Sequence, residues 1–430
     1  MTPVSRLWFS PFRLVAMVLA VLVSMVGQLS AQENQSTLAV RLDGLAGAYM
    51  TSEQVPGAIA VVVFGDQVIL RGYGLADVEQ RTPVTPDNTR FEIGSITKLF
   101  TWVAVMMLVE QGTLDLHADV SDYLKTTEMP GQEPPTLAQI MSHRSGYEES
   151  YEIFDPSVSS LSRVAALEAS ASEQVFPRGT ITSYSNWCAA LAGLVVEEVS
   201  GMTWEAFVQS RILDPLGMEN TTLRESLRRA DQPPLSQSYR LQGGVSIPTF
   251  RINIGAFAPA GSIASTSTDM AQFLRFMMGD GALDGTRLLQ PETMVQMRTR
   301  LFDDRPQAAD MAHGLQSKPQ FGTMVYGHGG GLNDFLSNLL FIPEIGAGIF
   351  ISQNGGTGAG LPHLVPDLML AQMASNAGVV PTDPQEVQDA SERAAEAEGR
   401  YLTNRRTFSG PAQIFAALSP LVVIALPDGA

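Results

Sequence analysis

The fold of this chain is decided by residues 91–98, which read FEIGSITK and lead into a long apolar segment. Apolar residues occupy nearly every side of that segment, so the sequence predicts a buried helix over 97–111. Ser95 and Lys98 are three residues apart where this helix begins, so they lie on one face, one turn apart. We therefore expect a serine and a lysine held together at the foot of a buried helix.

Such a pair is suited to nucleophilic catalysis. A serine hydroxyl is a weak nucleophile and needs a base beside it. Lysine can be that base where burial or neighbouring charges lower its pKa, and an ammonium at Lys98 would otherwise be unfavourable in an apolar helix. The free N–H groups at the helix start would also stabilise an oxyanion. A chance pairing of Ser95 with Lys98 is the alternative, so the motif alone only suggests this chemistry.

The second candidate motif is Tyr184-Ser185-Asn186, which opens a helix predicted over 187–200. A tyrosine phenol beside an ammonium can relay a proton to a leaving group. The amide of Asn186 can orient Lys98 and bind a substrate carbonyl. An ordinary turn with Asn186 as the helix N-cap explains the same residues, and the motif in isolation favours that simpler interpretation.

The third candidate is the glycine-rich run 328–331, which begins with His328 at the end of a strand-like segment. Glycine lets a substrate backbone approach a strand edge closely, so Gly330 and Gly331 are candidate substrate-binding residues. The N–H of Gly331 would complete an oxyanion hole with the N–H of Ser95. A flexible glycine turn with a surface histidine is the alternative.

Strand patterns occur toward both ends of the chain, and helical patterns fill the middle. Two apolar runs over 58–73 are separated by Gly65-Asp66, which predicts a β-hairpin. Short β-rich runs return between 322 and 352, whereas about 115–250 alternates helical patterns with Pro/Gly loops. We therefore expect one sheet built from both ends of the chain and a mainly helical lobe between them.

Three further helices are predicted outside this lobe, over 38–50, 262–279 and 362–376. Ser267 or Thr268 is the expected N-cap of the second of these helices. No internal repeat is found, and the length of 430 residues allows one large domain or two to three smaller ones.

The composition excludes several classes of protein. With 45% hydrophobic and 17% charged residues, the chain has the apolar content of a folded protein. Its net charge is −17, from 44 acidic and 27 basic residues, which argues against nucleic-acid binding. The single cysteine, Cys188, excludes an internal disulfide and a thiolate zinc site, and we expect it and His143 to be structural. Five histidines leave little room for a metal centre, and no cofactor is implied.

The order of the three motifs resembles that of the serine β-lactamase and penicillin-binding-protein family. Ser-x-x-Lys at 95–98, Tyr-x-Asn at 184–186 and His-x-Gly at 328–330 follow the arrangement of one branch of that family. This branch contains class C β-lactamases, D-alanyl-D-alanine carboxypeptidases and related esterases. The resemblance covers about 36–375 and extends to the flanking segments 91–94, 137–146, 214–218, 259–262 and 327–335.

The resemblance implies an α/β (α+β) fold of the β-lactamase/transpeptidase type, with an antiparallel sheet flanked by helices plus a mainly helical lobe. It implies that Ser95 is the acylated nucleophile and Lys98 its proton acceptor. Tyr184 would be a general base or proton relay, and Asn186 a polar anchor. His328 stands where many relatives carry a lysine. Because neutral histidine is a weaker partner for an anion, esterase or peptidase action is favoured over β-lactam hydrolysis.

Both ends of the chain are predicted to lie outside the hydrolase domain, which we place at 32–376. Residues 1–31 combine arginines, an apolar run and a small-residue cleavage site, as in a secretory signal peptide, so we expect a periplasmic or secreted protein. An uncleaved membrane anchor is the alternative. Residues 377–430 are expected to form an acidic linker and a tail that looks truncated beside longer relatives, and peripheral association with the cell envelope stays open.

The sequence as a whole predicts an exported serine hydrolase that forms an acyl-enzyme on Ser95. Its expected substrates are small-molecule esters, peptides or β-lactam-like compounds, without a metal, a cofactor or nucleic acid. The alternative belongs to another class of function, a catalytically weak module that binds or senses cell-wall peptides in the same pocket. The tail and His328 motivate this alternative, whereas Ser95, Lys98, Tyr184 and Asn186 together argue against it.

Overall fold

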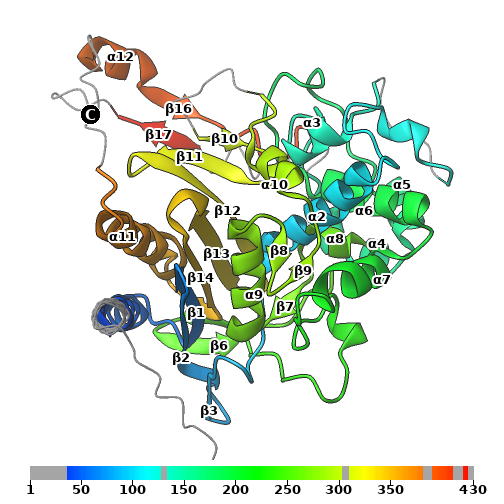
Figure 1. Cartoon of the computed structure of the whole chain (residues 1–430). Coiled ribbons are helices and arrows are strands. Elements are labelled where there is room, and N and C mark those ends of the chain that lie inside the picture. The colour runs from blue at the N-terminus through cyan, green and yellow to red at the C-terminus, as the bar shows by residue number, and fades with distance from the viewer. Residues whose placement is uncertain (1–35, 127–132, 303–308, 381–389, 410–419, 425–430) are drawn as a thin grey trace, which may run out of the picture.

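The computed structural model describes residues 36–126, 133–302, 309–380, 390–409 and 420–424. The predicted signal peptide lies outside these residues. In the described part, a large sheet has helices on both faces and a mainly helical lobe beside it, which confirms the predicted fold class (Figure 1). None of the helices described here has the length and apolar character needed to cross a membrane.

Eight strands form the large sheet: β1 Gly57–Phe64, β2 Gln67–Asp77, β3 Thr82–Pro83, β10 Asp310–Met311, β11 Gln316–Gln320, β12 Thr323–Leu332, β13 Phe335–Ile342 and β14 Ala347–Gln353. Their order is β10-β11-β12-β13-β14-β1-β2-β3, and neighbouring strands are antiparallel. Strand β1 pairs with β14 from Ala58↔Gln353 to Phe64↔Ala347. The prediction that the early hairpin and the late strands share one sheet is therefore confirmed.

The apolar sequence of β1 is explained by cover on both faces of the sheet. Its odd-numbered side chains between 58 and 63 pack in one hydrophobic cluster with α2 (Thr97–Glu110) and α9 (Ser267–Met278). Its even-numbered side chains pack in a second cluster with the helix at 36–52 and α11 (Gly360–Asn376). Because successive strand residues face opposite sides, a strand covered on both faces needs an unbroken apolar run.

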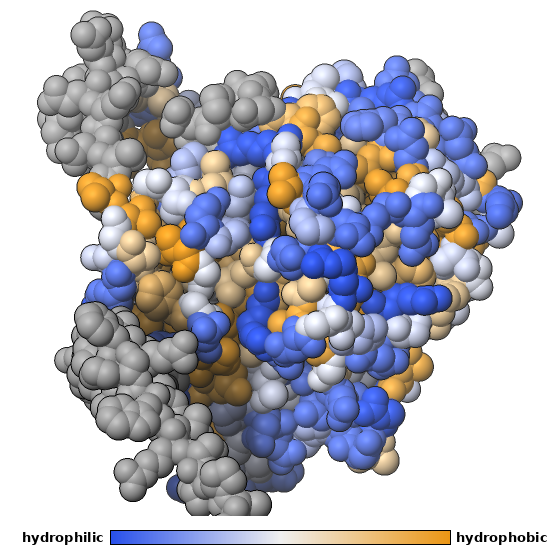
Figure 2. Space-filling model, in the orientation of Figure 1, coloured by the Kyte–Doolittle hydropathy of each residue, from blue (hydrophilic) through white to orange (hydrophobic). Residues whose placement is uncertain are grey.

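The predicted helical lobe lies between the hairpin and the late strands. It contains α3 Leu137–Met141, α4 Pro156–Ser159, α5 Arg163–Ala169, α6 Asn186–Ser200, α7 Trp204–Val208, the π-helix η4 Gln209–Leu213 and the 3-10 helices η2 Val120–Asp122, η3 Glu152–Phe154 and η5 Glu225–Leu227. On the visible face of the lobe, hydrophilic residues predominate and hydrophobic residues form small separate patches (Figure 2).

The lobe ends slightly earlier than the predicted limit of 250. Strands β5 (Tyr239–Gln242) and β6 (Val245–Pro248) form a hairpin there, and β5 pairs in parallel with β15 (Gly355–Gly356). The turn between β5 and β6 is two glycines with positive φ, Gly243-Gly244, a conformation that glycine adopts readily.

The helix predicted over 262–279 begins later than expected. The observed helix is α9, and its N-cap is Thr266, whose hydroxyl accepts a hydrogen bond from the Asp269 N–H at 3.2 Å. The prediction of Ser267 or Thr268 as the cap is therefore wrong. The residues before it form β7 (Ala264–Ser265), which pairs with β4 (Phe91–Glu92) just before Ser95.

The remaining described elements are η1 Gly94–Ile96, η6 Gly255–Phe257, α8 Ala258–Gly261, β8 Ala282–Leu283, β9 Thr286–Arg287, α10 Pro291–Arg298, η7 Pro343–Ile345, α12 Ala390–Ala397, β16 Gly399–Tyr401 and β17 Leu421–Val423. Strands β16 and β17 pair with each other, and residues 404–409 lie against the helical lobe. Figure 1 shows β16 and β17 beside the end of the sheet that carries β10 and β11.

Candidate active site

Ser95 lies in η1 at the foot of α2, where the sequence places it. Helix α2 is buried from Thr97 to Leu108, so its position in the core is fixed. The Thr97 hydroxyl accepts a hydrogen bond from the Ile263 N–H at 3.1 Å, and the Thr101 hydroxyl donates one to the Pro259 carbonyl at 2.9 Å. These contacts hold the first turns of α2 against the segment 259–263.

Lys98 is fully buried, and its ammonium nitrogen has three polar neighbours. Its Nζ lies 3.1 Å from Ser95 Oγ, 2.7 Å from Asn186 Oδ1 and 2.6 Å from the Ala260 carbonyl oxygen. The last two atoms can only accept hydrogen bonds, whereas a serine hydroxyl can also donate one. A neutral lysine would therefore donate to both carbonyls and direct its electron pair at Ser95.

Burial lowers the pKa of Lys98 well below its usual value, although the Glu149 carboxylate raises it and Arg405 lowers it further. A lysine whose pKa is lowered in this way can act as a base at moderate pH. The contacts and the burial of Lys98 thus suit a group that accepts a proton from Ser95.

Tyr184 reaches Ser95 from the helical lobe, just before α6. Its hydroxyl donates a hydrogen bond to Ser95 Oγ at 2.8 Å, and Lys98 Nζ lies 4.8 Å from the ring centroid. Burial raises the pKa of Tyr184, while Arg405 and the hydrogen bond to Ser95 lower it. The Tyr184 phenol is thus protonated. Hydrogen bonds connect its hydroxyl to Ser95 Oγ and Ser95 Oγ to Lys98 Nζ.

Asn186 is the first residue of α6 and is held by a buried carboxylate. Glu149 accepts hydrogen bonds from the Asn186 N–H and from its Nδ2, both at 3.0 Å. The N-cap of α6 is Ser185, whose hydroxyl accepts from the Cys188 N–H at 3.3 Å, so the alternative that Asn186 is the cap is wrong. With its Nδ2 bound to Glu149, the side chain of Asn186 presents its Oδ1 to Lys98.

Strand β12 runs through the glycine-rich segment and does not end at His328 as predicted. Its partner β11 stops at Gln316↔Gly327, so residues 328–332 pair with β13 alone within the described sheet. A Cβ on Gly94 would lie 2.5 Å from the Gly331 nitrogen, and one on Gly330 would lie 2.0 Å from the Ile93 carbonyl oxygen. Glycines at these positions allow the backbone of β12 to approach Ser95.

His328 is buried and does not present a cation to the site. Burial, together with the charge of Lys98, lowers its pKa to about 3. Its Nδ1 lies 2.5 Å from the Gly329 carbonyl oxygen, and its ring centroid is 6.3 Å from that of Tyr184. The alternative of a surface histidine is thus wrong, whereas a neutral side chain at this position agrees with the sequence analysis.

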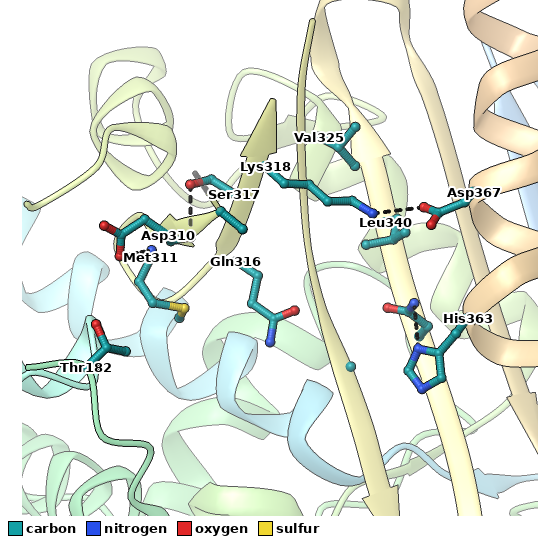
Figure 3. A pocket seen from close by; sticks show the side chains of 13 residues that line it. Thr182, Asp310, Met311, Gln316, Ser317, Lys318, Val325, Leu340, His363 and Asp367 are labelled. Atoms are coloured by element: carbon teal, nitrogen blue, oxygen red, sulfur yellow. Dashed lines mark hydrogen bonds and ion pairs between the residues drawn. The ribbon is translucent and has the colours of Figure 1, made fainter. Parts of the chain in front are cut away.

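Two cavities adjoin β12 at neighbouring positions. One, of about 590 Å³, is lined by Gly329, and Figure 3 shows Thr182 on one side of it and the α11 residues His363 and Asp367 on the other. Asp367 pairs there with Lys318 at 3.0 Å (Figure 3). The other cavity, of about 530 Å³, is lined by residues 331–334 and by the exposed apolar side chains Ile247, Phe250 and Ile252. The lining of neither cavity includes Ser95, Lys98 or Tyr184, so both cavities adjoin β12 and not the serine itself.

Sequence reasoning missed three parts of this site. Glu149 follows the segment 137–146 that carried the resemblance, but nothing in its neighbours indicates contact with Asn186. The Ala260 carbonyl is a backbone group, and backbone contacts leave no mark on residue identity. Arg405 comes from the far end of the chain and places its guanidinium 4.2 Å from the Tyr184 ring centroid. Only the folded structure brings these groups together.

The residues expected to be structural are buried. Cys188 lies 3.3 Å from the Ser145 hydroxyl, and burial raises the pKa of its thiol to about 11. His143 packs against Tyr184 with 4.2 Å between ring centroids, and burial lowers its pKa well below the usual value. Among the described residues, no group of three or more His, Cys, Asp or Glu side chains is placed to bind a metal ion.

Comparison with known proteins gives a consistent result. A family model described as Beta-lactamase matches residues 42–373. The chain is 30% identical to Penicillin-binding protein 4 of Amycolatopsis lactamdurans over 329 residues, which are 72% of this chain and 83% of that protein. The octameric penicillin-binding protein homologue from Pyrococcus abyssi is 25% identical with a TM-score of 0.68, covering 84% of this chain and 82% of that one.

A class C β-lactamase shares the fold, with a TM-score of 0.67 at 21% identity over 79% of this chain and 97% of that one. The large antiparallel sheet, the helices on both faces and the helical lobe are the architecture of the β-lactamase/transpeptidase-like fold. The chain therefore belongs to the Beta-lactamase family, the serine hydrolase family of β-lactamases and penicillin-binding proteins.

Proposed function

We propose that this chain is an exported serine hydrolase that acts on ester or amide carbonyls through an acyl-enzyme on Ser95. The observation that carries the proposal is the surroundings of Ser95 Oγ, which lies 2.8 Å from the Tyr184 hydroxyl and 3.1 Å from Lys98 Nζ. Because the other two contacts of Nζ are with carbonyl oxygens, a neutral Lys98 directs its electron pair at the serine proton.

Acylation then follows in two steps. Lys98 Nζ takes the proton of Ser95 while Oγ forms a bond to the substrate carbonyl carbon, and the carbonyl oxygen becomes an oxyanion. The backbone N–H groups of Ser95 and Gly331 stabilise that oxyanion. Tyr184 gives its proton to the leaving group as the bond to that group breaks, and the proton on Lys98 restores the phenol.

Deacylation uses the same residues in the opposite direction. A water molecule gives a proton to Tyr184 as Tyr184 passes its own proton to neutral Lys98, and the oxygen of the water attacks the acyl carbon. The proton then passes to Ser95 Oγ as the bond between Oγ and the acyl carbon breaks, which releases the acid and restores the free enzyme. Ser95 Oγ lies within hydrogen-bond distance of both Lys98 Nζ and the Tyr184 hydroxyl. This geometry supports the use of the same groups for proton transfer in acylation and in deacylation.

Esters and peptides are the proposed substrates, ahead of β-lactams. The position at which many relatives carry a lysine is occupied by His328, whose low pKa keeps it neutral. The cavity beside Gly331 has exposed apolar side chains at Ile247 and Phe250, which suits an apolar acyl group.

A binding module without turnover is the competing proposal. Such a module has no need for a buried lysine fixed between two carbonyls, because burying that group is unfavourable for folding. Export is part of the main proposal and rests on residues 1–31. N-terminal sequencing of protein recovered from the periplasm or medium tests it, with cleavage after Ala31 as the expected result.

The proposal is tested by the intact mass of the protein after incubation with a fluorophosphonate probe. We expect one adduct on the wild-type chain and none on Ser95→Ala, because only an activated serine attacks phosphorus rapidly. Ser52→Ala, an exposed serine on the helix at 36–52, is the matched control and should keep the adduct. Failure of the folded wild-type protein to form the adduct would favour the binding module.

A further inference from the structure

The segment 404–409, called the docked tail below, is attached to the helical lobe beside the candidate active site. Glu148 is 4% exposed, and its carboxylate accepts hydrogen bonds from the N–H groups of Phe408 and Ser409 and from the Ser409 hydroxyl. Among the described residues, these tail groups are the only hydrogen-bond partners of that carboxylate. A buried acid with such partners indicates a built docking site and not a chance contact.

Further contacts extend along the docked tail on both sides. The Ser183 hydroxyl donates to the Asn404 carbonyl at 3.0 Å, and the Thr407 hydroxyl donates to the Glu149 carbonyl at 3.1 Å. Phe408 packs edge-on against Phe176 with 5.1 Å between ring centroids. The docked tail is therefore fixed to the residues immediately before Tyr184 and to the segment that carries Glu149.

This attachment places Arg405 over the catalytic-type tyrosine. The guanidinium carbon lies 4.2 Å from the Tyr184 ring centroid, and Nε lies 3.4 Å from a carboxylate oxygen of Glu149. The side chain is 56% exposed, and its two terminal nitrogens have no hydrogen-bond acceptor among the described residues. Arg405 thus presents two donor groups and a positive charge to the space beside Tyr184.

Lys98 and His328, the other positive or potentially positive groups near Tyr184, are unable to bind an anionic substrate. Farther along β12, Lys318 is paired with Asp367 and Arg240 with Asp334. Lys98 is fully buried, and its Nζ already makes polar contacts with Ser95, Asn186 and Ala260. His328 is buried and neutral. An arginine with free terminal nitrogens is the side chain best suited to a carboxylate, because its planar group forms two parallel hydrogen bonds.

We propose that Arg405 is the specificity-determining residue of this site and binds a carboxylate on the leaving group of the substrate. The proposal rests on the proposed function, in which Tyr184 passes a proton to the leaving group. Because Arg405 covers the ring of Tyr184, a carboxylate near the scissile bond on that side meets the guanidinium. The substrate class is therefore an ester or peptide whose leaving group ends in a free carboxylate.

The test compares two thioesters with the same phenylacetyl group. One has thioglycolate as its leaving group and the other has the methyl ester of thioglycolate, so the pair differs in one negative charge. We expect the wild-type enzyme to prefer the anionic thioester, and Arg405→Gln to reduce the ratio of the two kcat/KM values about tenfold, mainly through KM. Arg405→Lys should retain part of the preference.

Arg400→Gln is the matched control, since Arg400 is an exposed arginine of the same tail in β16 and its loss changes the net charge equally. It should keep the wild-type ratio. An unchanged ratio in Arg405→Gln would overturn the proposal. An equal loss for both thioesters would also overturn it, because Arg405 would then act through Tyr184 and not through the substrate.

A binding measurement separates this proposal from the proposed function. Calorimetric titration of both thioesters into Ser95→Ala, with and without Arg405→Gln, needs no turnover. If Ser95→Ala binds the anionic thioester more tightly and Arg405→Gln removes this difference, the role of Arg405 is supported, whether or not the wild-type enzyme hydrolyses the compounds. If the wild-type enzyme hydrolyses neither compound, the proposed function is refuted instead. The absence of any preference in Ser95→Ala would refute the role of Arg405.

A second variant tests the docked tail itself. Glu148→Gln keeps Arg405 but removes the charge that binds Phe408 and Ser409, so the anion preference should fall as it does in Arg405→Gln. Glu152→Gln, an exposed neighbour in η3, is its control and should behave as wild type. A full preference in Glu148→Gln would show that the tail contacts do not position Arg405.

Discussion

Glu149 binds Asn186 through both of its carboxylate oxygens, one to the backbone N–H and one to the side-chain Nδ2, each at 3.0 Å. This pair fixes which atom of the amide faces Lys98, because a carboxylate without a proton can only accept hydrogen bonds. Glu149 is thus a positioning residue that acts on Lys98 through Asn186, and also through its charge.

We predict that Glu149→Gln lowers kcat about tenfold to a hundredfold, because glutamine offers one acceptor and the second contact with Asn186 is lost. The Glu149 carboxylate raises the pKa of Lys98, so its removal lowers that pKa. If Lys98 must be neutral to act, the acidic limb of the kcat/KM profile moves to lower pH. Glu152→Gln is the control, and a limb that moves to higher pH would contradict this role for Glu149.

Lys98 is predicted to be irreplaceable by arginine. Arginine stays protonated at any pH that the protein tolerates, so Lys98→Arg should lower kcat/KM at least about a thousandfold between pH 5 and 10. In the wild-type enzyme, kcat/KM should rise with pH as Lys98 loses its proton, at a pH well below that of an exposed lysine because burial lowers its pKa. Lys125→Arg, at an exposed position, should have no effect. Substantial activity in Lys98→Arg would show that another group accepts the serine proton.

The approach of β12 to Ser95 gives a prediction with a neighbouring control. A Cβ on Gly330 would lie 2.0 Å from the Ile93 carbonyl oxygen and 3.2 Å from the Ser95 nitrogen, so Gly330→Ala must move the strand away from the serine. We expect kcat/KM to fall about a hundredfold, because a displacement near 1 Å is enough for such a loss. A Cβ on Gly329 meets no atom closer than 3.9 Å, so Gly329→Ala should lose far less. Equal losses in the two variants would contradict the close contact.

Cys188 gives a test of the core that does not depend on activity. Its thiol is buried and burial raises its pKa to about 11, so the thiolate is scarce and shielded near neutral pH. The native protein should therefore leave its single thiol unlabelled by a disulfide reagent at pH 8, and guanidinium chloride should expose one thiol per chain. Rapid labelling of the native protein would show that the start of α6 opens easily.

Much of the fold is predictable from the sequence because its signals are local. The apolar run of β1 and the glycine turn after it predict the hairpin, and the apolar helix after Ser95 is long enough to identify without its surroundings. The course of β12 past His328 is different. A run of glycines has little intrinsic strand preference, and pairing with β13 is what extends the strand to Leu332.

The candidate site is predictable only where its residues belong to a motif. Ser95, Lys98, Tyr184 and Asn186 are found this way, and the structure brings them within hydrogen-bond reach of one another. Glu149 and Arg405 act on them from loops whose paths depend on tertiary contacts, so no spacing rule could identify either residue.

Because β1 pairs with β14, the large sheet cannot form fully during synthesis until residues near the end of the chain have been made. The hairpin of β1 and β2 leaves the ribosome long before Ala347, the first residue of its neighbouring strand. At about 5 to 20 residues per second, the free edge of β1 waits on the order of 15 to 60 s for its partner. Closing so long a loop makes pairing slow, and an apolar strand edge without its partner is open to aggregation. A chaperone that binds extended apolar segments would thus find its target in residues 57–64 of the nascent chain.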